Sequence, residues 1–243
     1  MHRFLIEPGL RTGDTARLGS EEAQHALKVL RLKTGCPVQA MDGMGRAWTG
    51  TLVEDRDGAG IRLESEIPSN ESPVKITLYM GIPKGEKLEL IAQKLTELGA
   101  SRLVPVRMER CVARIPEGEA EKKLSRARRI SREAQKQSGR QTEMTIDDPL
   151  DFGQMLLSLS RHEAVFLLWE NAEGYRLIDA RSEKENLSDI AFVVGPEGGI
   201  TNAEAEKLMS AGAAAVTLGA RILRAETAAI AGCAAIQTLW GDL

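Results

Sequence analysis

From residue 75 onward the chain alternates between short apolar runs and longer segments with helical periodicity. The runs at 164–170 and 190–195 are apolar almost without interruption, which is typical of strands buried on both faces of a sheet. Thr201 and Glu204 form a capping box, and Gly212 ends the helix that they start. This alternation predicts an α/β domain with a parallel sheet. The predicted strands are KITLYMG (75–81), RLVPV (102–106), AVFLLWE (164–170), IAFVVG (190–195) and AAVTLG (214–219).

The first seventy residues have a different pattern. Short runs, several of them alternating in polarity, are separated by Gly and Asp turns and interrupted by one helical stretch at 20–31. This pattern predicts a small barrel-like β domain over residues 1–70. The segment PSNESP then indicates a linker, after which the second domain covers 73–243. The predicted strands are HRFLI (2–6), PVQAM (37–41), AWTGTLVE (47–54) and GIRLESEI (60–67).

Composition excludes several classes of protein. No apolar run approaches the roughly 18 residues that a membrane-spanning helix needs, and the N-terminal segment is too short in its apolar part for a signal peptide. We therefore expect a cytoplasmic protein with no membrane partner. The three cysteines and three histidines are widely spaced, so neither disulfides nor a metal site is predicted.

Three predicted strands end in unusual loops, LLWEN (167–171), GPEGG (195–199) and LGARILRAET (218–227). Ligands of parallel α/β domains bind beyond the carboxyl ends of the strands, and glycines let a ligand approach the backbone closely. Each loop taken alone is also compatible with a tight turn. The three together favour a ligand site. The chain has no G-x-x-x-x-G-K-[ST] motif and no G-x-G-x-x-G motif before a helix, which disfavours a P-loop NTPase and a Rossmann dinucleotide enzyme.

Basic residues are unevenly distributed along the chain. The net charge is −3, yet the segment 102–140 carries twelve basic residues against five acidic ones. A solvated helix face is one explanation for such a run, and an RNA-binding face is the other. Arg221 and Arg224 precede a helix rich in Ala and Gly, where the helix dipole disfavours a cation. This unfavourable position favours a functional role for Arg224.

These motifs resemble the RsmE-type ribosomal RNA small-subunit methyltransferases of the SPOUT superfamily. VVGPEGGIT and LGARILRAETAA carry the resemblance, together with HALKVLR (25–31), KGEKLELIAQKLTELGASRLVPV (84–106) and EAQKQSGR (133–140). The resemblance implies a PUA-like N-terminal β domain for RNA recognition and a SPOUT domain with a C-terminal deep trefoil knot. It further implies a homodimer, S-adenosylmethionine as methyl donor, and methylation at N3 of one uridine in 16S ribosomal RNA within the small ribosomal subunit.

Roles for particular residues follow as hypotheses from the resemblance, the chemistry of N3 methylation and the excess of basic residues. We expect Arg224 and Arg140 near the uracil, with Glu197 or Glu226 as an orienting group or proton acceptor. The expected cofactor-binding residues are Leu168, Glu170, Gly195, Pro196, Glu197, Gly198, Gly199, Leu218, Gly219, Ile222, Leu223 and Thr227. The expected RNA-binding residues are Arg31, Lys84, Arg110, Arg126, Arg129, Arg132 and Lys136.

Two other functions stay open. Ribose 2′-O-methyltransferases of the same superfamily usually show a Ser-Leu-Asn pattern in the last motif, where this chain has RILRAETAA, so base methylation is favoured. A non-catalytic RNA-binding factor in ribosome assembly could keep the cofactor fold without turnover. Only a measurement of turnover separates that factor from an enzyme.

Overall fold

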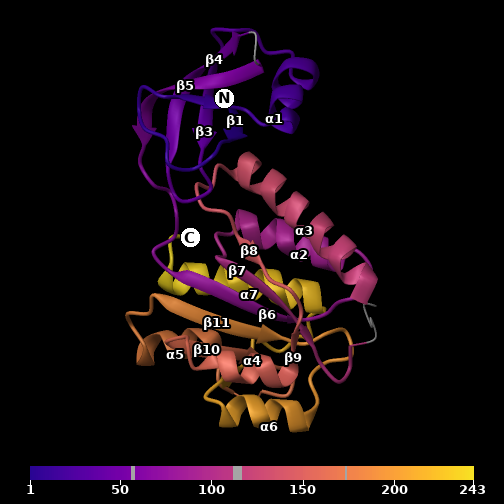
Figure 1. Ribbon diagram of the computed structural model, residues 1–243. Helices are drawn as coiled ribbons and strands as arrows, with labels where there is room; N and C mark the ends of the chain where they lie inside the picture. The colour runs from indigo at the N-terminus through magenta and orange to yellow at the C-terminus, as the bar shows by residue number, and fades with distance from the viewer. Residues whose placement is uncertain (56–57, 112–116, 173) are drawn as a thin grey trace. The chain divides into compact units, whose positions relative to one another are not determined.

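A computed structural model describes residues 1–55, 58–111, 117–172 and 174–243 (Figure 1). The chain folds into two compact units. The first contains residues 1–71 together with 132–143, and the second contains 72–131 and 144–243. Within the described ranges, no helix combines the length and apolar character that a membrane span requires.

The first unit is built on a five-stranded sheet with the order β1-β3-β4-β5-β2. β1 and β3 are parallel, and the remaining neighbours are antiparallel. Alternating side chains along these strands, among them Phe4, Trp48 and Leu52, are fully buried in one apolar core. The strands are β1 (His2–Leu5), β2 (Thr15–Arg17), β3 (Pro37–Met41), β4 (Ala47–Asp55) and β5 (Gly58–Ile67).

The helical stretch predicted at 20–31 changes its geometry halfway. The α-helix α1 (Ser20–Gln24) continues as a π-helical turn, η1 (His25–Val29), in which Leu30 N–H donates to the His25 carbonyl over 2.9 Å. Arg31 then has φ 53°, and it is the one non-glycine residue in the described chain with a positive φ. Such wide turns and left-handed residues are stabilised by surrounding structure, not by local preference, so the sequence pattern could not predict them.

The second unit confirms the predicted parallel sheet. Its seven strands have the order β12-β10-β11-β6-β7-β8, with β9 also paired to β7, and every pairing is parallel. The central strands are buried on both faces, as their continuous apolar sequences predict. The strands are β6 (Lys75–Gly81), β7 (Arg102–Arg107), β8 (Thr145–Ile146), β9 (Leu150–Asp151), β10 (Ala164–Leu168), β11 (Asp189–Val194) and β12 (Ala214–Val216).

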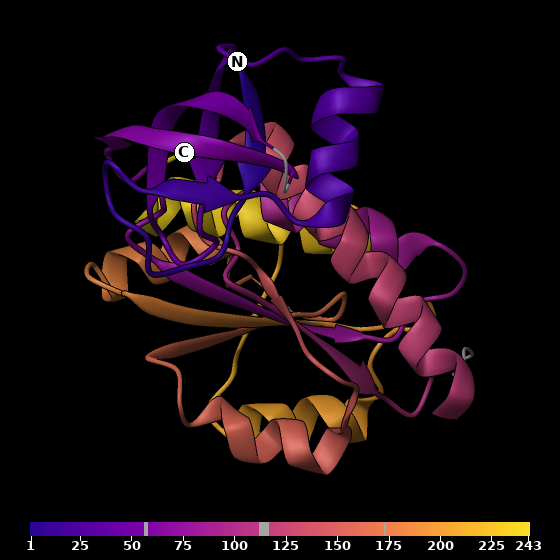
Figure 2. The ribbon, with the colours of Figure 1, turned by 45° about the horizontal axis from the view of Figure 1, so that its top comes forward.

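Helices cover both faces of this sheet (Figures 1 and 2). α2 and α7 pack on one face and α5 contacts α7, whereas α4 and α6 pack on the other. The predicted capping box at Thr201 and Glu204 is present at the start of α6. The helices are α2 (Lys87–Glu97), α3 (Glu117–Ser138), α4 (Phe152–Leu159), α5 (Leu177–Glu183), α6 (Asn202–Ser210) and α7 (Ala225–Trp240).

Candidate active-site cleft

A cleft opens in the second unit where β10, β11 and β12 end. Its volume is about 520 Å³. The three loops that follow these strands form most of its wall, as their sequences predict. It is lined by Lys87, Leu168, Trp169, Glu170, Val194, Gly195, Pro196, Glu197, Gly198, Gly199, Val216, Thr217, Leu218, Gly219, Ala220, Arg221, Ile222, Leu223, Arg224, Ala225 and Ala228.

The GPEGG loop at 195–199 needs its glycines because neighbouring atoms leave no room for a side chain. A Cβ at Gly195 would lie 2.6 Å from Ile200, and a Cβ at Gly198 would lie 2.8 Å from the carbonyl oxygen of Arg110. Gly199 has φ +74°, and a Cβ there would lie 2.5 Å from a carboxylate oxygen of Glu170. The loop backbone therefore forms the cleft wall without side chains of its own at these positions.

Hydrogen bonds at the start of α6 fix the C-terminal end of the GPEGG loop. Glu204 N–H donates to the Thr201 hydroxyl over 3.2 Å, and Thr201 N–H donates to the Glu204 carboxylate over 3.0 Å. The same carboxylate accepts the Glu109 N–H over 2.9 Å, so α6 is also tied to the segment after β7. In that segment, the Arg110 guanidinium donates to the Gly198 carbonyl over 3.2 Å.

The loop between β12 and α7 forms the opposite wall. The Thr217 hydroxyl accepts the Gly219 N–H over 3.1 Å, and Gly219 has φ +119°. Ile222 is 85% exposed at the mouth of the cleft. Arg224 is the extended residue immediately before α7, and its side chain is exposed. Gly232 lets α7 approach the sheet, because a Cβ there would lie 2.5 Å from Leu168.

Lys87 joins two acidic residues beside the cleft. Its ammonium lies 3.1 Å from Glu197 Oε1 and 3.0 Å from Glu226 Oε2. Its contacts with Glu226 and Glu197 raise the pKa of Lys87. Burial acts to raise the pKa of both carboxyls, but hydrogen bonds from backbone N–H groups and the ion pairs with Lys87 outweigh it, so both pKa values are lowered. All three groups are therefore charged at neutral pH.

Most of the predicted cofactor residues line this one cleft. Eleven of the twelve do so, and the exception, Thr227, is exposed on the first turn of α7. Of the predicted catalytic residues, Arg224 and Glu197 line the cleft, and Glu226 is joined to it through Lys87. Lys87 was not predicted as a site residue, and Trp169 was predicted to line the site only as part of the LLWEN motif.

Arg140 belongs to the first unit. It is 6% exposed, and its guanidinium donates to the Glu71 carboxylate over 2.8 Å. In the same unit, Lys136 lies 2.8 Å from both Glu22 and Glu133. These two predicted site cations are therefore ion-paired in the structure, and their expected roles stay predictions.

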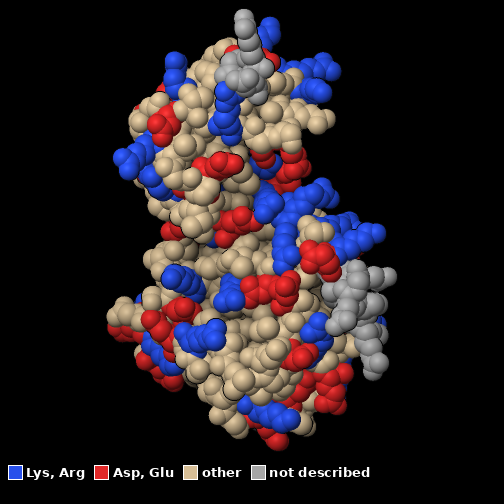
Figure 3. All heavy atoms as spheres, viewed as in Figure 1, with Lys and Arg blue, Asp and Glu red and all other residues tan. Residues whose placement is uncertain are grey.

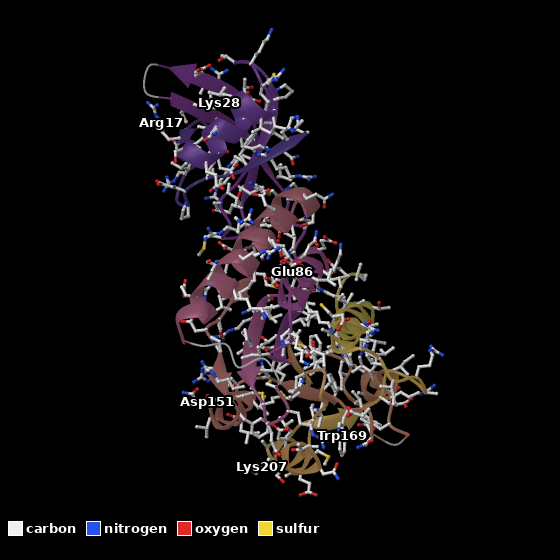
Figure 4. The ribbon with its side chains drawn as sticks, turned by 90° about the vertical axis from the view of Figure 1, so that its right-hand side faces the viewer. Arg17, Lys28, Glu86, Asp151, Trp169 and Lys207 are labelled. Atoms are coloured by element: carbon white, nitrogen blue, oxygen red, sulfur yellow. The ribbon has the colours of Figure 1, made fainter. Side chains whose placement is uncertain are left out.

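The remaining predicted RNA-binding side chains are exposed. Lys84, Arg110, Arg126 and Arg129 lie on the second unit, and Arg126 pairs with Glu86 (labelled in Figure 4) over 2.7 Å. Lys and Arg side chains gather over α3 on the face shown in Figure 3. Arg31 and Arg132 are exposed in the first unit, where Arg132 pairs with Glu143 over 2.9 Å. No described group of three or more His, Cys, Asp or Glu residues is arranged to hold a metal.

Comparison with known proteins defines the class of this α/β domain and its cleft. A family model described as an RNA methyltransferase domain matches residues 70–237. A ribosomal RNA small subunit methyltransferase E from Synechocystis is 33% identical over 98% of this chain and 78% of its own length.

Solved structures agree with this relationship. The crystal structure of a ribosomal RNA small subunit methyltransferase E from Neisseria gonorrhoeae bound to S-adenosyl methionine superposes with a TM-score of 0.89 and 37% identity, covering 100% of this chain and 99% of that one. A putative methyltransferase from Legionella pneumophila in complex with the same cofactor gives a TM-score of 0.89 at 29% identity, covering 99% and 98%. The chain therefore belongs to the ribosomal RNA small subunit methyltransferase E family of RNA methyltransferases.

Proposed function

We propose that this protein transfers a methyl group from S-adenosylmethionine to N3 of a uridine in the 16S ribosomal RNA of the small ribosomal subunit. One observation carries the proposal. The three loops that the sequence marks as ligand-binding converge on a single glycine-built cleft, in a chain whose relatives are ribosomal RNA methyltransferases, one of them solved with this cofactor.

The cleft fits the cofactor in size and in chemistry. Its volume of about 520 Å³ lies within the range of roughly 300–1,000 Å³ that is typical of small-molecule sites. The glycines of 195–199 expose backbone to the cleft, and the buried Trp169 Nε1 has no hydrogen-bond partner among the described residues. Bound S-adenosylmethionine supplies an activated methyl group on a positively charged sulfur. The residues proposed to hold it are Leu168, Glu170, the glycine loop 195–199, Leu218, Gly219, Ile222, Leu223 and Thr227.

The proposed role of Arg224 is to stabilise negative charge on the uracil. Uridine N3 reacts after it loses its proton to solvent, which leaves negative charge on the ring. An arginine at the exposed edge of a cofactor cleft supplies a fixed positive charge where that charge develops. Glu197 and Glu226 are already bound to Lys87, which favours an orienting role over that of proton acceptor. The role proposed for Arg140 beside the uracil rests on the family resemblance.

The exposed basic residues are proposed to contact RNA phosphates. Arg126 and Arg129 lie on α3, and Lys84 and Arg110 lie on segments that contact Glu197 and Gly198 of the cleft. Such contacts add affinity for any RNA sequence and weaken with salt. Arg31, Arg132 and Lys136 are proposed RNA contacts of the first unit.

We also propose the finer architecture that the family resemblance implies. Residues 1–70 form a PUA-like RNA-recognition domain, which the mixed five-stranded sheet supports. Residues 73–243 form a SPOUT domain whose cofactor site is a deep trefoil knot, and the protein is a homodimer. Because its substrate would be the small ribosomal subunit, we place it in the cytoplasm.

Labelled cofactor tests the proposed function. Tritiated S-adenosylmethionine is incubated with the protein and with small subunits from cells that lack its gene, and large subunits serve as the control. We expect label in 16S RNA and none in the large subunit. Measurable cofactor binding without label in either subunit would contradict the proposal and favour an RNA-binding assembly factor.

A further inference from the structure

Lys87 lies where three separate elements meet beside the cleft. It is the first residue of α2, whereas Glu197 belongs to the loop after β11 and Glu226 to the first turn of α7. Its ammonium contacts one carboxylate oxygen of each, at 3.1 and 3.0 Å. Glu197 Oε1 also accepts the backbone N–H of Lys84 over 3.0 Å. The contact therefore joins the GPEGG loop, the start of α2 and the start of α7.

The two carboxylates depend on this cation. Both lie within about 3 Å of the same nitrogen, so without it they would face each other at short range with like charges. All three side chains are largely shielded from water, with exposed fractions of 29%, 22% and 15% for Lys87, Glu197 and Glu226. Shielding from water strengthens the attraction between Lys87 and the two carboxylates, and it would equally strengthen the repulsion between the carboxylates if Lys87 were removed.

Other charged or titratable groups do not substitute for Lys87. Arg224 attracts Glu226, but no contact joins it to Glu197 among the described residues. The Cys111 thiol lies in the segment after β7. Burial and, to a smaller extent, the negative charge of Glu197 raise its pKa, so the thiol is neutral at neutral pH and cannot replace the Lys87 cation. Lys84 meets Glu197 through its backbone N–H.

We propose that Lys87 is a positioning residue, the centre of an ionic clasp Glu197–Lys87–Glu226 that holds the GPEGG loop against the start of α7. Because Arg224 immediately precedes α7, the clasp also fixes Arg224 at the edge of the cleft. This inference rests on the proposed methyltransferase function for its effect on turnover. The clasp itself does not depend on that function.

The first arm of the test uses the protein alone. Carboxyl resonances of Glu197 and Glu226 are followed by NMR during a pH titration of wild type, Lys87→Met and Lys87→Arg. We expect both carboxyl pKa values to rise in Lys87→Met and to stay low in Lys87→Arg. Lys94→Met is the matched control, because Lys94 lies on the same helix and pairs with Glu97 over 2.9 Å outside the cleft. Unchanged carboxyl titrations in Lys87→Met would overturn the clasp.

The second arm measures cofactor affinity and turnover. Misplacement of a catalytic group by about 1 Å costs roughly 100-fold in rate, so Lys87→Met should lower kcat about 100-fold. Because the carboxyl pKa values rise in this variant, the acid limb of its pH–rate profile should shift to higher pH. Lys87→Met/Glu226→Gln removes the repulsion between the carboxylates and should recover at least about tenfold of the loss. Lys94→Met should match wild type in kcat and in the Kd for S-adenosylmethionine from calorimetry.

Each outcome decides a different question. A double variant no faster than Lys87→Met would overturn the positioning role of Lys87. If wild type does not methylate RNA, the proposed function fails, and the NMR titration still decides whether the clasp exists.

Discussion

Substitution of Gly81 tests whether close packing between β6 and the GPEGG loop shapes the cleft. It is the last residue of β6, and its backbone packs against the loop that carries Pro196. A Cβ added at Gly81 would lie 2.5 Å from both the nitrogen and the Cδ of Pro196, and 3.0 Å from the carbonyl carbon of Gly195. These are backbone and ring atoms, which cannot turn away as the end of a flexible side chain can. Gly81→Ala therefore forces either the strand or the loop to move.

The size of the effect follows from this overlap. Extra methyl groups in a tightly packed site cost about 1–3 kcal/mol. If the loop moves to relieve the strain, the same energy appears as lost cofactor affinity, and each 1.4 kcal/mol corresponds to about a tenfold rise in Kd. We expect the loss of unfolding free energy and the loss of binding free energy together to reach about 2 kcal/mol for Gly81→Ala.

Urea unfolding followed by circular dichroism gives the stability, and calorimetry gives the Kd for S-adenosylmethionine. Gly153→Ala is the control, because it adds the same methyl group within α4, where no atom lies within 4 Å of the new Cβ. In a helix this change stabilises by up to about 1 kcal/mol. Wild-type stability and affinity in Gly81→Ala would refute the reasoning from loop packing.

Three further predictions concern charge. Arg224→Ala should lower kcat by at least about 100-fold in the labelled-cofactor assay while the Kd for the cofactor stays near that of wild type; near-normal turnover would remove Arg224 from the mechanism. Replacing both Arg126 and Arg129 by Gln should reduce the slope of log K against log salt for RNA binding by about 2, and an unchanged slope would exclude them as phosphate contacts. The folded-state pKa values of Glu197 and Glu226 lie below their ordinary 4.5, so their contribution to stability is present above that pH and lost as the pH falls through the folded values. Urea unfolding of wild type and of the double Gln variant should therefore differ most above about pH 5 and converge in acid.

Local sequence signals predicted the framework of the second unit. All five predicted strands are present, and the apolar runs of β10 and β11 mark strands buried on both faces, whereas in the three-residue β12 only Val216 is buried. The capping box of α6 could also be predicted, because Thr201 and Glu204 are only three residues apart. The short helix α4 was not predicted, although Asp151 and Gln154 form its capping box. The helix has only eight residues, too few for its apolar periodicity to stand out.

The sequence allowed prediction of those cleft residues that directly follow a strand. Cleft residues on other elements could not be predicted. The glycine loop could be placed because the carboxyl ends of parallel strands meet at one edge. Lys87 could not, because its partner Glu197 is distant in sequence and reaches it only through the pairing of β6 with β11. The ion pairs of the basic helix α3 could not be predicted for the same reason. The acids that pair with Arg126, Arg132 and Lys136 include Glu86, Glu143 and Glu22, which lie outside the helix.

The identity of the labelled nucleoside tests the central claim most directly. After reaction of small subunits with tritiated S-adenosylmethionine, 16S RNA is digested and its nucleosides are separated. The proposed function predicts a single labelled product, 3-methyluridine, that disappears with Arg224→Ala. Label in a ribose 2′-O-methyl nucleoside would contradict base methylation and favour methylation of the ribose.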